Sequence, residues 1–346
     1  MSKKELPAED AGIDAAELGI NTAIESIAGV PIPKPVRQNA LKAFGRLCSA
    51  AIEIPIASWE GIAAEKKALA EARVKLIETT ATQIANQMEE DKEYARVAFQ
   101  KYGQKIIREQ VNLDQISEEA ARQLKDTDNA QIGEEIGQID DDWLNHFEKE
   151  ACQRSTEDMQ LLFGKILAGE IRRPSSFSIK AVKIMGEIDK ATANLFKRLC
   201  SMCIVMGIPG TNQIFDARVV SLSGNAGNNA LQKYGLGFDE LNILHEYGLI
   251  IADYNSWRDY RSSIAYKNNV VILGFSHQNT YWGLLPEEER KDGQALKLHG
   301  VALSQVGREL LNIVEVEPIE NYTNDLIEFF AKRKLKMVPI SEEKGT

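Results

Sequence analysis

The sequence predicts a mainly α-helical fold, with long N-terminal helices and a central helical bundle followed by a smaller α+β module. Three observations support this prediction. Residues 62–111 contain no proline and are rich in Ala, Glu, Lys and Gln, which are strong helix formers. Residues 140–205 place apolar side chains at helical spacing. After residue 208, short apolar stretches alternate with Gly- and Asn-rich loops, which indicates strands between helices.

Composition limits the classes of protein that fit. The chain has 346 residues, of which 44% are hydrophobic and 27% charged, as in an ordinary globular protein of two or three compact units. A net charge of -10 argues against general nucleic-acid binding, because neutralising phosphates requires clustered Lys and Arg. Four cysteines are too few for a disulfide scaffold, and neither a secretory signal nor a transmembrane run is recognisable. We therefore expect a cytoplasmic protein.

Residues 1–60 are predicted to form an apolar N-terminal arm. Prolines restrict this arm to short helices or bent segments, because proline lacks a backbone donor and clashes with the preceding helical turn. Ile54, Ile56 and Trp59 form an apolar cluster around Pro55 and are candidate interaction residues. Two interpretations stay open. The arm packs on the body or on a second subunit, or it binds a partner or the surface of the inner membrane as a peripheral segment.

Residues 61–125 are predicted to form a long helical segment. Apolar residues recur near seven-residue spacing at Ile62, Leu69, Leu76, Ile77 and Ile84. The pattern fits one long helix, a helical hairpin or a dimerising coiled coil. In the hairpin the break would fall near Glu89–Asp91 or Gly103, and we expect a further short helix from Asn112 to Gln123. Residues 124–139 are interpreted as a linker because Asp, Asn and Gly dominate there.

Residues 140–207 are predicted to form a helical bundle. Asp140–Asp142 precede an apolar helix that starts at Trp143, where acidic side chains complement the helix dipole; a metal-binding role is the alternative. Ser155–Asp158 has the form of a helix start, and Pro174 ends that helix. The stripe between them consists of Met159, Leu162, Phe163, Ile166 and Leu167.

Residues 208–340 are predicted to form the α+β module. The expected strands are 218–222, 270–275 and 297–303, and the expected helices are 238–247, 304–312 and 324–334. The order of these elements is similar to that of winged-helix proteins, in which a short sheet packs on a helix pair. It consists of a helix, the tripeptide Gly-Leu-Ile, strands and a final segment, Leu303–Leu310. A winged-helix DNA-binding regulator is therefore an alternative function, although the net negative charge opposes it.

The candidate chemical motifs are weak. Cys200 and Cys203 form a C-x-x-C without a second ligand pair for zinc, and they fall late on an apolar helix face, so we interpret them as core cysteines. The loop Gly224–Gly227 lacks the Lys-Ser/Thr of a phosphate-binding loop. His277 and His299 lie beside predicted strands and are read as structural, with a pocket as the alternative. We predict no catalytic residue, no cofactor and no metal site.

Arg172 and Arg173 are further candidate interaction residues. They directly precede Pro174 at the end of a predicted helix. Two arginines can bind a carboxylate or a phosphate with paired hydrogen bonds. The alternative is that they only complement the negative end of the helix dipole.

One stretch of the chain resembles a known family. Asp142-Trp143, Phe147, the run Met159-Gln-Leu-Leu-Phe-Gly-Lys-Ile-Leu-Ala-Gly-Glu-Ile171, Pro174 and Ser176-Phe-Ser178 resemble the bacterial family catalogued as domain of unknown function 2806. Residues 108–116 resemble the lead-in of that family. The resemblance brings no established activity and no catalytic residue. More distantly, the order of the segments is similar to abortive-infection proteins of the Abi-alpha type, which implies phage defence.

These patterns lead to one expected function and its alternatives. We expect a bacterial, non-enzymatic interaction protein that contacts a protein partner or a second copy of itself, in phage defence or a stress response. The alternatives are a winged-helix DNA-binding regulator, a membrane-associated effector and an enzyme whose site is assembled from scattered residues.

Overall fold

The computed structural model describes residues 33–48, 79, 92–126, 136–208, 213–266, 270–288 and 294–340. The chain divides into two compact units, Met1–Gly186 and Glu187–Thr346. The boundary falls inside residues 140–207, and each unit is described by itself below.

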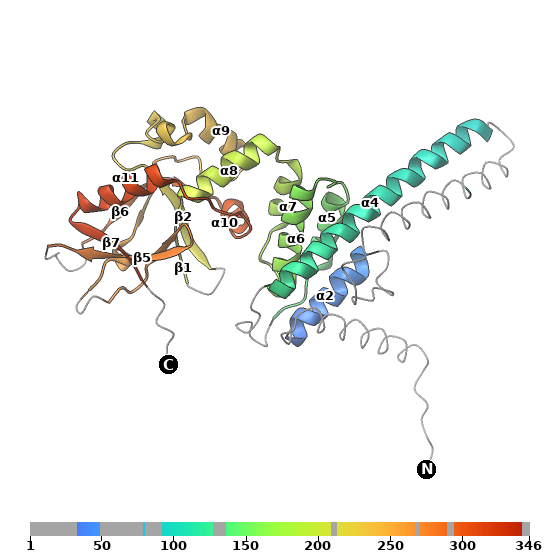
Figure 1. The fold of residues 1–346 in the computed structure, drawn as a ribbon, viewed down its shortest axis with the longest axis horizontal. Helices are drawn as coiled ribbons and strands as arrows, with labels where there is room; N and C mark the ends of the chain where they lie inside the picture. Colours follow the sequence, from blue (N-terminus) through green and yellow to red (C-terminus); the bar gives the residue numbers. More distant parts are fainter. Residues whose placement is uncertain are drawn as a thin grey trace, which may run out of the picture. The chain divides into compact units, whose positions relative to one another are not determined.

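The described part of the first unit is helical (Figure 1). It contains α2 (Lys34–Leu47), α4 (Lys92–Asp126), α5 (Asp141–Ala151), α6 (Glu157–Arg172) and α7 (Ile179–Glu187), whose last residue begins the second unit. α6 packs along α4, and α2 contacts both. The Asn39 amide of α2 donates to the carbonyl oxygen of Ile171 at the end of α6, at 3.2 Å, and its Oδ1 accepts from the Ile139 N–H at 3.1 Å. α2 is thereby joined to two distant segments of the same unit.

Helix α4 is continuous across the position where the sequence predicted a second helix to begin. It runs without interruption for 35 residues, so it contains no break at Gly103, one of the two places considered for a break, and the predicted new helix at Asn112 is wrong. Asn112 does not cap a helix; its amide donates instead to the carbonyl oxygen of Cys152, at 2.8 Å. Tertiary contact therefore outweighs the local tendency of Asn to begin a helix. The predicted cap of α5 is confirmed, because Asp140 Oδ1 accepts from the Trp143 N–H at 2.9 Å.

The connection between α6 and α7 is held by a buried carboxylate. Glu170 accepts two backbone hydrogen bonds, from Ser175 at 2.6 Å and from Phe177 at 3.0 Å. The Phe177 carbonyl oxygen in turn accepts from the Trp143 indole N–H at 2.7 Å. Gly169 makes room for this turn, because a Cβ there would lie 2.6 Å from the Phe177 ring. The hydrogen bonds of Glu170 and the absence of a Cβ at Gly169 together determine the conformation of this turn.

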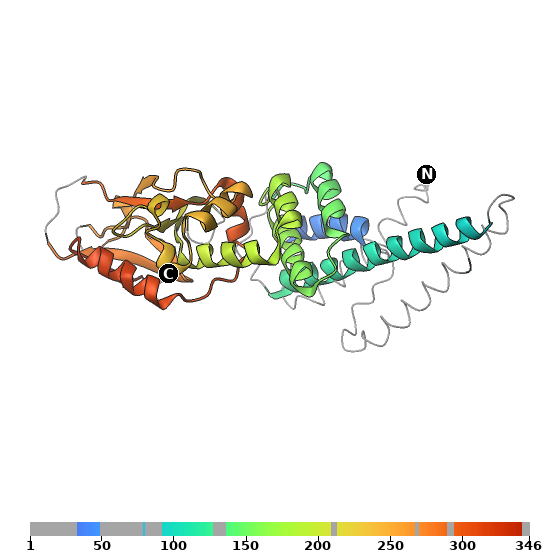
Figure 2. The ribbon, with the colours of Figure 1, turned by 90° about the horizontal axis from the view of Figure 1, so that it is seen from above.

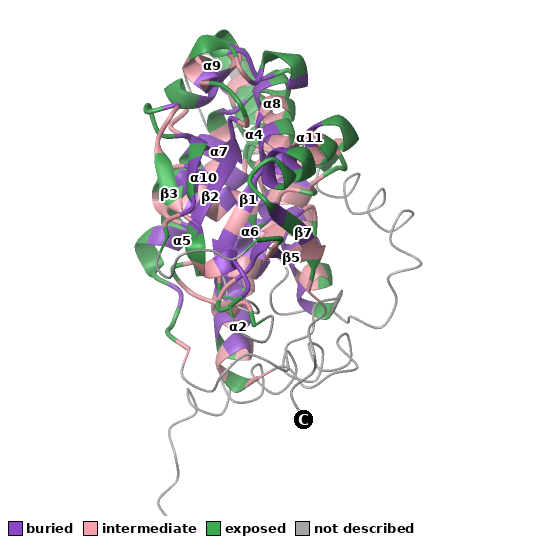
Figure 3. Ribbon diagram, turned by 90° about the vertical axis from the view of Figure 1, so that its left-hand side faces the viewer, coloured by how far each residue is buried: buried purple, intermediate pink, exposed green. Residues whose placement is uncertain are grey.

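The second unit is built on a seven-stranded sheet in which all strand pairs are antiparallel, in the order β3-β6-β2-β1-β4-β5-β7. The strands are β1 (Ile204–Gly207), β2 (Ile214–Val220), β3 (Trp257–Asp259), β4 (Phe275–His277), β5 (Thr280–Pro286), β6 (Lys297–Ala302) and β7 (Leu335–Pro339). The helices are α8 (Lys190–Met202), α9 (Phe238–Glu246), α10 (Gln305–Leu311) and α11 (Glu320–Ala331). Near the middle of the sheet, β2 is buried over most of its length (Figure 3).

The fold class predicted from the sequence is wrong. The chain is mixed α/β, with an extensive antiparallel sheet where a small winged-helix-like module was expected. The strands are only three to seven residues long, and several pair with distant partners, as β2 does with β6. Strands this short contain too few residues to show an alternating pattern in the sequence. β1 begins two residues after α8 ends, so in the sequence its apolar residues look like a continuation of that helix. Residues 270–274, predicted as a strand, lie outside the strands, and β4 begins at Phe275.

Aromatic side chains form the core between α11 and the sheet. The hydroxyl of buried Tyr322 donates to the Val220 carbonyl oxygen of β2, at 3.1 Å, and its ring meets the Tyr234 ring edge-on. Phe330 stacks on Phe275 of β4, with ring centroids 5.9 Å apart. These contacts fix α11 on the sheet at two points, one in each half of the helix.

Replacing Glu170 tests the connection between α6 and α7. Glu170→Ala leaves the N–H groups of Ser175 and Phe177 without their acceptor, so we expect the free energy of unfolding to fall by about 2–4 kcal/mol. Glu170→Gln keeps one acceptor oxygen and should cost less. Urea denaturation followed by Trp fluorescence measures both, and equal stability of Glu170→Ala and the unmodified protein would contradict the assignment.

Candidate interaction surface

The structure places only some of the predicted site residues. Ile54, Ile56 and Trp59 lie outside the described residues. Arg172 lies at the end of α6, where its Nη2 donates to the Gln123 carbonyl oxygen of α4, at 3.0 Å. Burial lowers the pKa of the Arg172 guanidinium, and the charge of Arg173 lowers it further. Arg172 thus joins two helices of the bundle, while anion binding by the pair stays a prediction.

The C-x-x-C cysteines lie in the core of the second unit. Cys200 and Cys203 are buried, and this burial raises the pKa of both thiols well above its usual range. A thiol that resists deprotonation is a poor nucleophile and a poor metal ligand. Among the described residues, no group of three or more His, Cys, Asp and Glu side chains is placed to hold a metal ion.

His277 is a buried structural histidine. Its Nδ1 lies 3.0 Å from the Cys203 carbonyl oxygen and its Nε2 lies 3.0 Å from the Thr323 hydroxyl. Because a carbonyl oxygen only accepts, Nδ1 carries the hydrogen and Nε2 accepts from Thr323. Burial lowers the pKa of this imidazole, which favours the neutral form. His299 lies on β6, is exposed, and contacts the Asn255 carbonyl oxygen at 3.1 Å.

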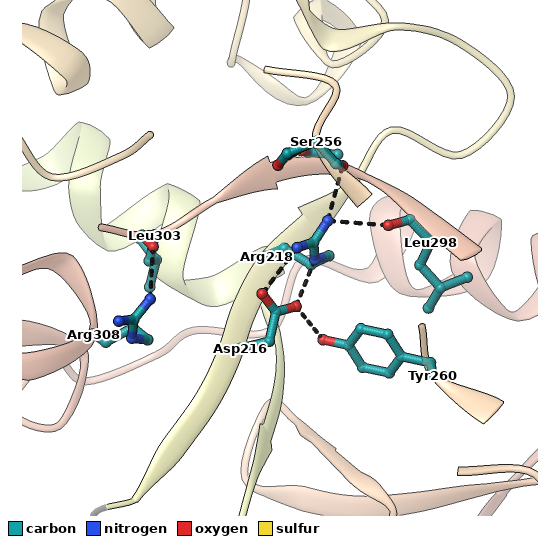
Figure 4. A network of polar contacts seen from close by, with 8 residues as sticks. Asp216, Arg218, Ser256, Tyr260, Leu298, Leu303 and Arg308 are labelled. Carbon is teal, nitrogen blue, oxygen red and sulfur yellow. Dashed lines mark hydrogen bonds and ion pairs between the residues drawn. The ribbon is translucent and has the colours of Figure 1, made fainter. Parts of the chain in front are cut away.

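A buried ion pair lies at the β2, β3 and β6 side of the sheet (Figure 4). Arg218 donates to both carboxylate oxygens of Asp216, at 2.5 and 2.9 Å, and the Tyr260 hydroxyl donates to the same carboxylate at 2.8 Å. The Arg218 Nη1 also donates to the carbonyl oxygens of Ser256, at 2.8 Å, and Leu298, at 3.1 Å. The two charges satisfy each other inside the unit, and they tie the ends of β3 to β2 and β6. This cluster is a structural element of the sheet.

An apolar seam runs along helix α4. Apolar residues recur at alternating intervals of four and three, interrupted only at Glu109. They are Ala95, Phe99, Tyr102, Ile106, Leu113, Ile116 and Ala120. The last three are buried where α4 packs on α2, α5 and α6. We call the first four the α4 seam.

The α4 seam is exposed over most of its length. The side chains of Phe99, Tyr102 and Ile106 are 40%, 68% and 64% exposed, while the small Ala95 is buried. Figures 1 and 2 show that the first half of α4 extends beyond α2, α5, α6 and α7. Four-three spacing keeps these side chains on one face of the helix, in the arrangement that accepts a second helix. Exposed apolar side chains that lie together on one face make this part of α4 a candidate interaction surface.

The first half of α4 is rich in basic side chains. Arg96, Lys101, Lys105 and Arg108 are all exposed on the first half of α4, in a chain whose net charge is -10. Residues 92–109 contain two acidic residues, Glu93, which pairs with Arg96 at 2.7 Å, and Glu109. The helical spacing puts Arg96 and Lys105 on either side of the α4 seam, so the surface is apolar along its centre with one basic residue at each border, while Lys101 and Arg108 lie on the opposite face. The sequence contains the four-three spacing, but only the structure shows which half of it is covered.

Comparison with known proteins identifies the family. The model of the family described as protein of unknown function (DUF2806) matches residues 96–327. The chain belongs to the DUF2806 family. The resemblance predicted from residues 142–178 is thereby confirmed, and the DUF2806 match includes most of α4. No curated protein matches this chain, and no solved structure matches it. Among the residues that the structure describes, no helix combines the length and apolar character needed to cross a membrane.

Breaking the buried ion pair tests its structural role. Arg218→Met leaves the Asp216 carboxylate buried without its main partner, so we expect a loss of about 3–5 kcal/mol in the free energy of unfolding. The double variant Asp216→Leu, Arg218→Met removes both charges and should be more stable than Arg218→Met alone. Thermal denaturation measures both; a double variant less stable than the single one would contradict this account.

The stability of the second unit should depend on the protonation of His277. Its pKa is lowered in the folded state, so the unfolded chain binds the proton more readily, and stability falls as the pH drops below about 6.5. His277→Gln should reduce this slope between pH 7 and pH 5. The exposed His299→Gln is the matched control. An identical slope in His277→Gln and the unmodified protein, measured by urea denaturation, would overturn the assignment.

Proposed function

We propose that this DUF2806 protein is a bacterial, non-enzymatic interaction protein that acts in phage defence of the abortive-infection kind. In this proposal the α4 seam is the surface through which it binds a helix of another protein. The exposure of Phe99, Tyr102 and Ile106 on one helix face carries the proposal. The distant similarity of the segment order to Abi-alpha type proteins supports the defence role, and the position of α4 supports the contact.

The size of the α4 seam sets the strength of such a contact. Its three exposed side chains are already partly buried, so completing their burial contributes on the order of 3–5 kcal/mol, scaled from about 1.5–3 kcal/mol for a fully exposed side chain. Association of two free molecules costs at least about 4 kcal/mol in lost translational and rotational freedom. We therefore expect a weak, reversible contact with a free partner, in which the basic residues beside the seam favour an acidic helix.

A membrane-associated effector is the second candidate. Tyr94 and Tyr102 are exposed beside Lys101 and Lys105 on the first half of α4. Tyrosine and lysine together also suit the boundary between water and anionic lipid headgroups. The DNA-binding alternative depended on a winged-helix module, which the seven-stranded sheet replaces, so we do not propose it.

Phage titration tests the proposed function. The unmodified protein, expressed in a phage-sensitive host, should lower plaque counts for part of a broad phage panel, and Tyr102→Ser, Ile106→Ser should abolish this protection. Tyr94→Ser, Val97→Ser is the matched control, because these two side chains are exposed on the same half of α4 but outside the seam. Unchanged plaque counts with the unmodified protein across the panel would contradict the defence role.

A further inference from the structure

We propose that the α4 seam pairs with the α4 seam of a second copy of this chain, in antiparallel orientation and around a two-fold axis that passes near Gln100 and Lys101. The pairing uses the surface described under the proposed function, and it rests on that proposal only for its consequence, which is that a partner helix competes with the second copy. The contact itself is argued from the exposure of α4, its residue spacing and its neighbouring helices.

The neighbouring helices decide the orientation of the second copy. From Leu113 onward, the apolar face of α4 is covered by α2, α5 and α6 of the same chain. A parallel second copy would run along this covered half and collide with those helices. It would also set Glu109 against Glu109 of the second copy in the line of the seam, where like charges repel. In antiparallel orientation Glu109 lies level with the start of α4 in the other copy, so the two bundles lie at opposite ends of the contact.

The α4 seam is complementary to itself in this orientation. Its four residues alternate between the two apolar positions of a heptad, and antiparallel pairing sets one kind of position opposite the other. Ala95 then faces Ile106 and Phe99 faces Tyr102, and the two-fold axis repeats both pairs. At each end of the contact the small Ala95 leaves room for Ile106, which is 64% exposed in the single chain. At the centre the rings of Phe99 and Tyr102 from both copies meet, and aromatic rings pack favourably when offset or edge-on.

The residues that border the α4 seam are compatible with a second copy. The same register sets Arg96 beside Gly103 of the other copy and Lys105 beside Ala98. Each long basic side chain therefore meets a small uncharged residue and no like charge. A glycine inside a helix lowers the stability of that helix relative to alanine, and at Gly103 the missing side chain makes room for Arg96 of the second copy.

Two-fold symmetry doubles the apolar area of the contact. Each copy contributes three exposed seam side chains, so six are buried together, while the entropic cost of association is met only once. The contact is still small in comparison with stable dimer interfaces. We therefore expect a weak, reversible dimer with a Kd on the order of 0.1–1 mM.

Pairing of two seams has a consequence for the proposed function. The α4 seam cannot hold a second copy and a partner helix at the same time. A partner helix therefore shifts the dimer towards single chains, and a high concentration of the protein withholds the seam from weaker competitors.

Sedimentation equilibrium tests the pairing. The mass of the full chain should rise from that of one copy towards that of two as the concentration passes through about 0.1–1 mM. Tyr102→Ser, Ile106→Ser should weaken self-association at least about tenfold, because the two-fold axis repeats each substitution. Tyr94→Ser, Val97→Ser is the matched control and should dimerise like the unmodified protein. A single chain at every concentration, or a dimer that Tyr102→Ser, Ile106→Ser leaves unchanged, would overturn the inference.

Disulfide formation between two variants tests the register. Ala95→Cys and Ile106→Cys are made as separate full-length proteins, each with Cys48→Ser and Cys152→Ser, so that the two remaining native thiols are buried. On mild oxidation the mixture should give a disulfide-linked dimer on a non-reducing gel. Neither protein alone should do so, because like positions lie about 16 Å apart along the antiparallel pair and a disulfide spans less than about 7 Å between Cα atoms.

Each other outcome overturns the inference. Linked dimers of Ile106→Cys alone would indicate parallel pairing and deny the register. Absence of linked dimers from the mixture, repeated with Phe99→Cys and Tyr102→Cys so that one poorly folded variant does not decide, denies the contact. Dimerisation without any effect of Tyr102→Ser, Ile106→Ser on plaque counts keeps the pairing and removes the proposed function. Loss of protection in a protein that stays a single chain keeps the function and removes the pairing.

Discussion

One constraint organises the first unit: the apolar face of α4 is longer than the bundle that covers it. From Leu113 onward this face is buried by the neighbouring helices, and before Glu109 the same face is largely exposed. A helix of 35 residues stays continuous because the packing of its second half anchors it and no proline interrupts it. Among the described helices of this unit, none covers the first half of α4, and its apolar face is largely exposed there.

Several charged or polar side chains of types common in active sites are buried and hydrogen-bonded to other groups of the protein. The Asp216 carboxylate is neutralised by Arg218 and hydrogen-bonded by Tyr260. His277 is held between a carbonyl oxygen and a hydroxyl, and the Glu170 carboxylate accepts two backbone hydrogen bonds. Buried polar groups must find partners inside the protein, so each of these side chains serves the structure.

The stretch that carries the sequence resemblance to the family also has a structural explanation. A Cβ at Gly164 would lie 2.6 Å from the side chain of Glu119, so a glycine lets α6 approach α4 closely. Gly169 admits the Phe177 ring, and Glu170 then fixes the turn that follows α6. The most recognisable residues of this DUF2806 chain thus encode helix packing and one turn.

The sequence by itself determined the helices that begin at a local cap or carry a full amphipathic stripe. α5 begins at its Asp140 cap, and α6 buries Phe163, Ile166 and Leu167. Tertiary structure alone decided the seven-stranded sheet, because strands as short as β3 and β4 are stabilised by partners distant in the chain. It also decided that Tyr102 and Ile106 are exposed while Leu113 and Ile116 are buried. The local sequence pattern shows which face of a helix is apolar. Whether that face is buried depends on which other segments pack against it in the tertiary structure.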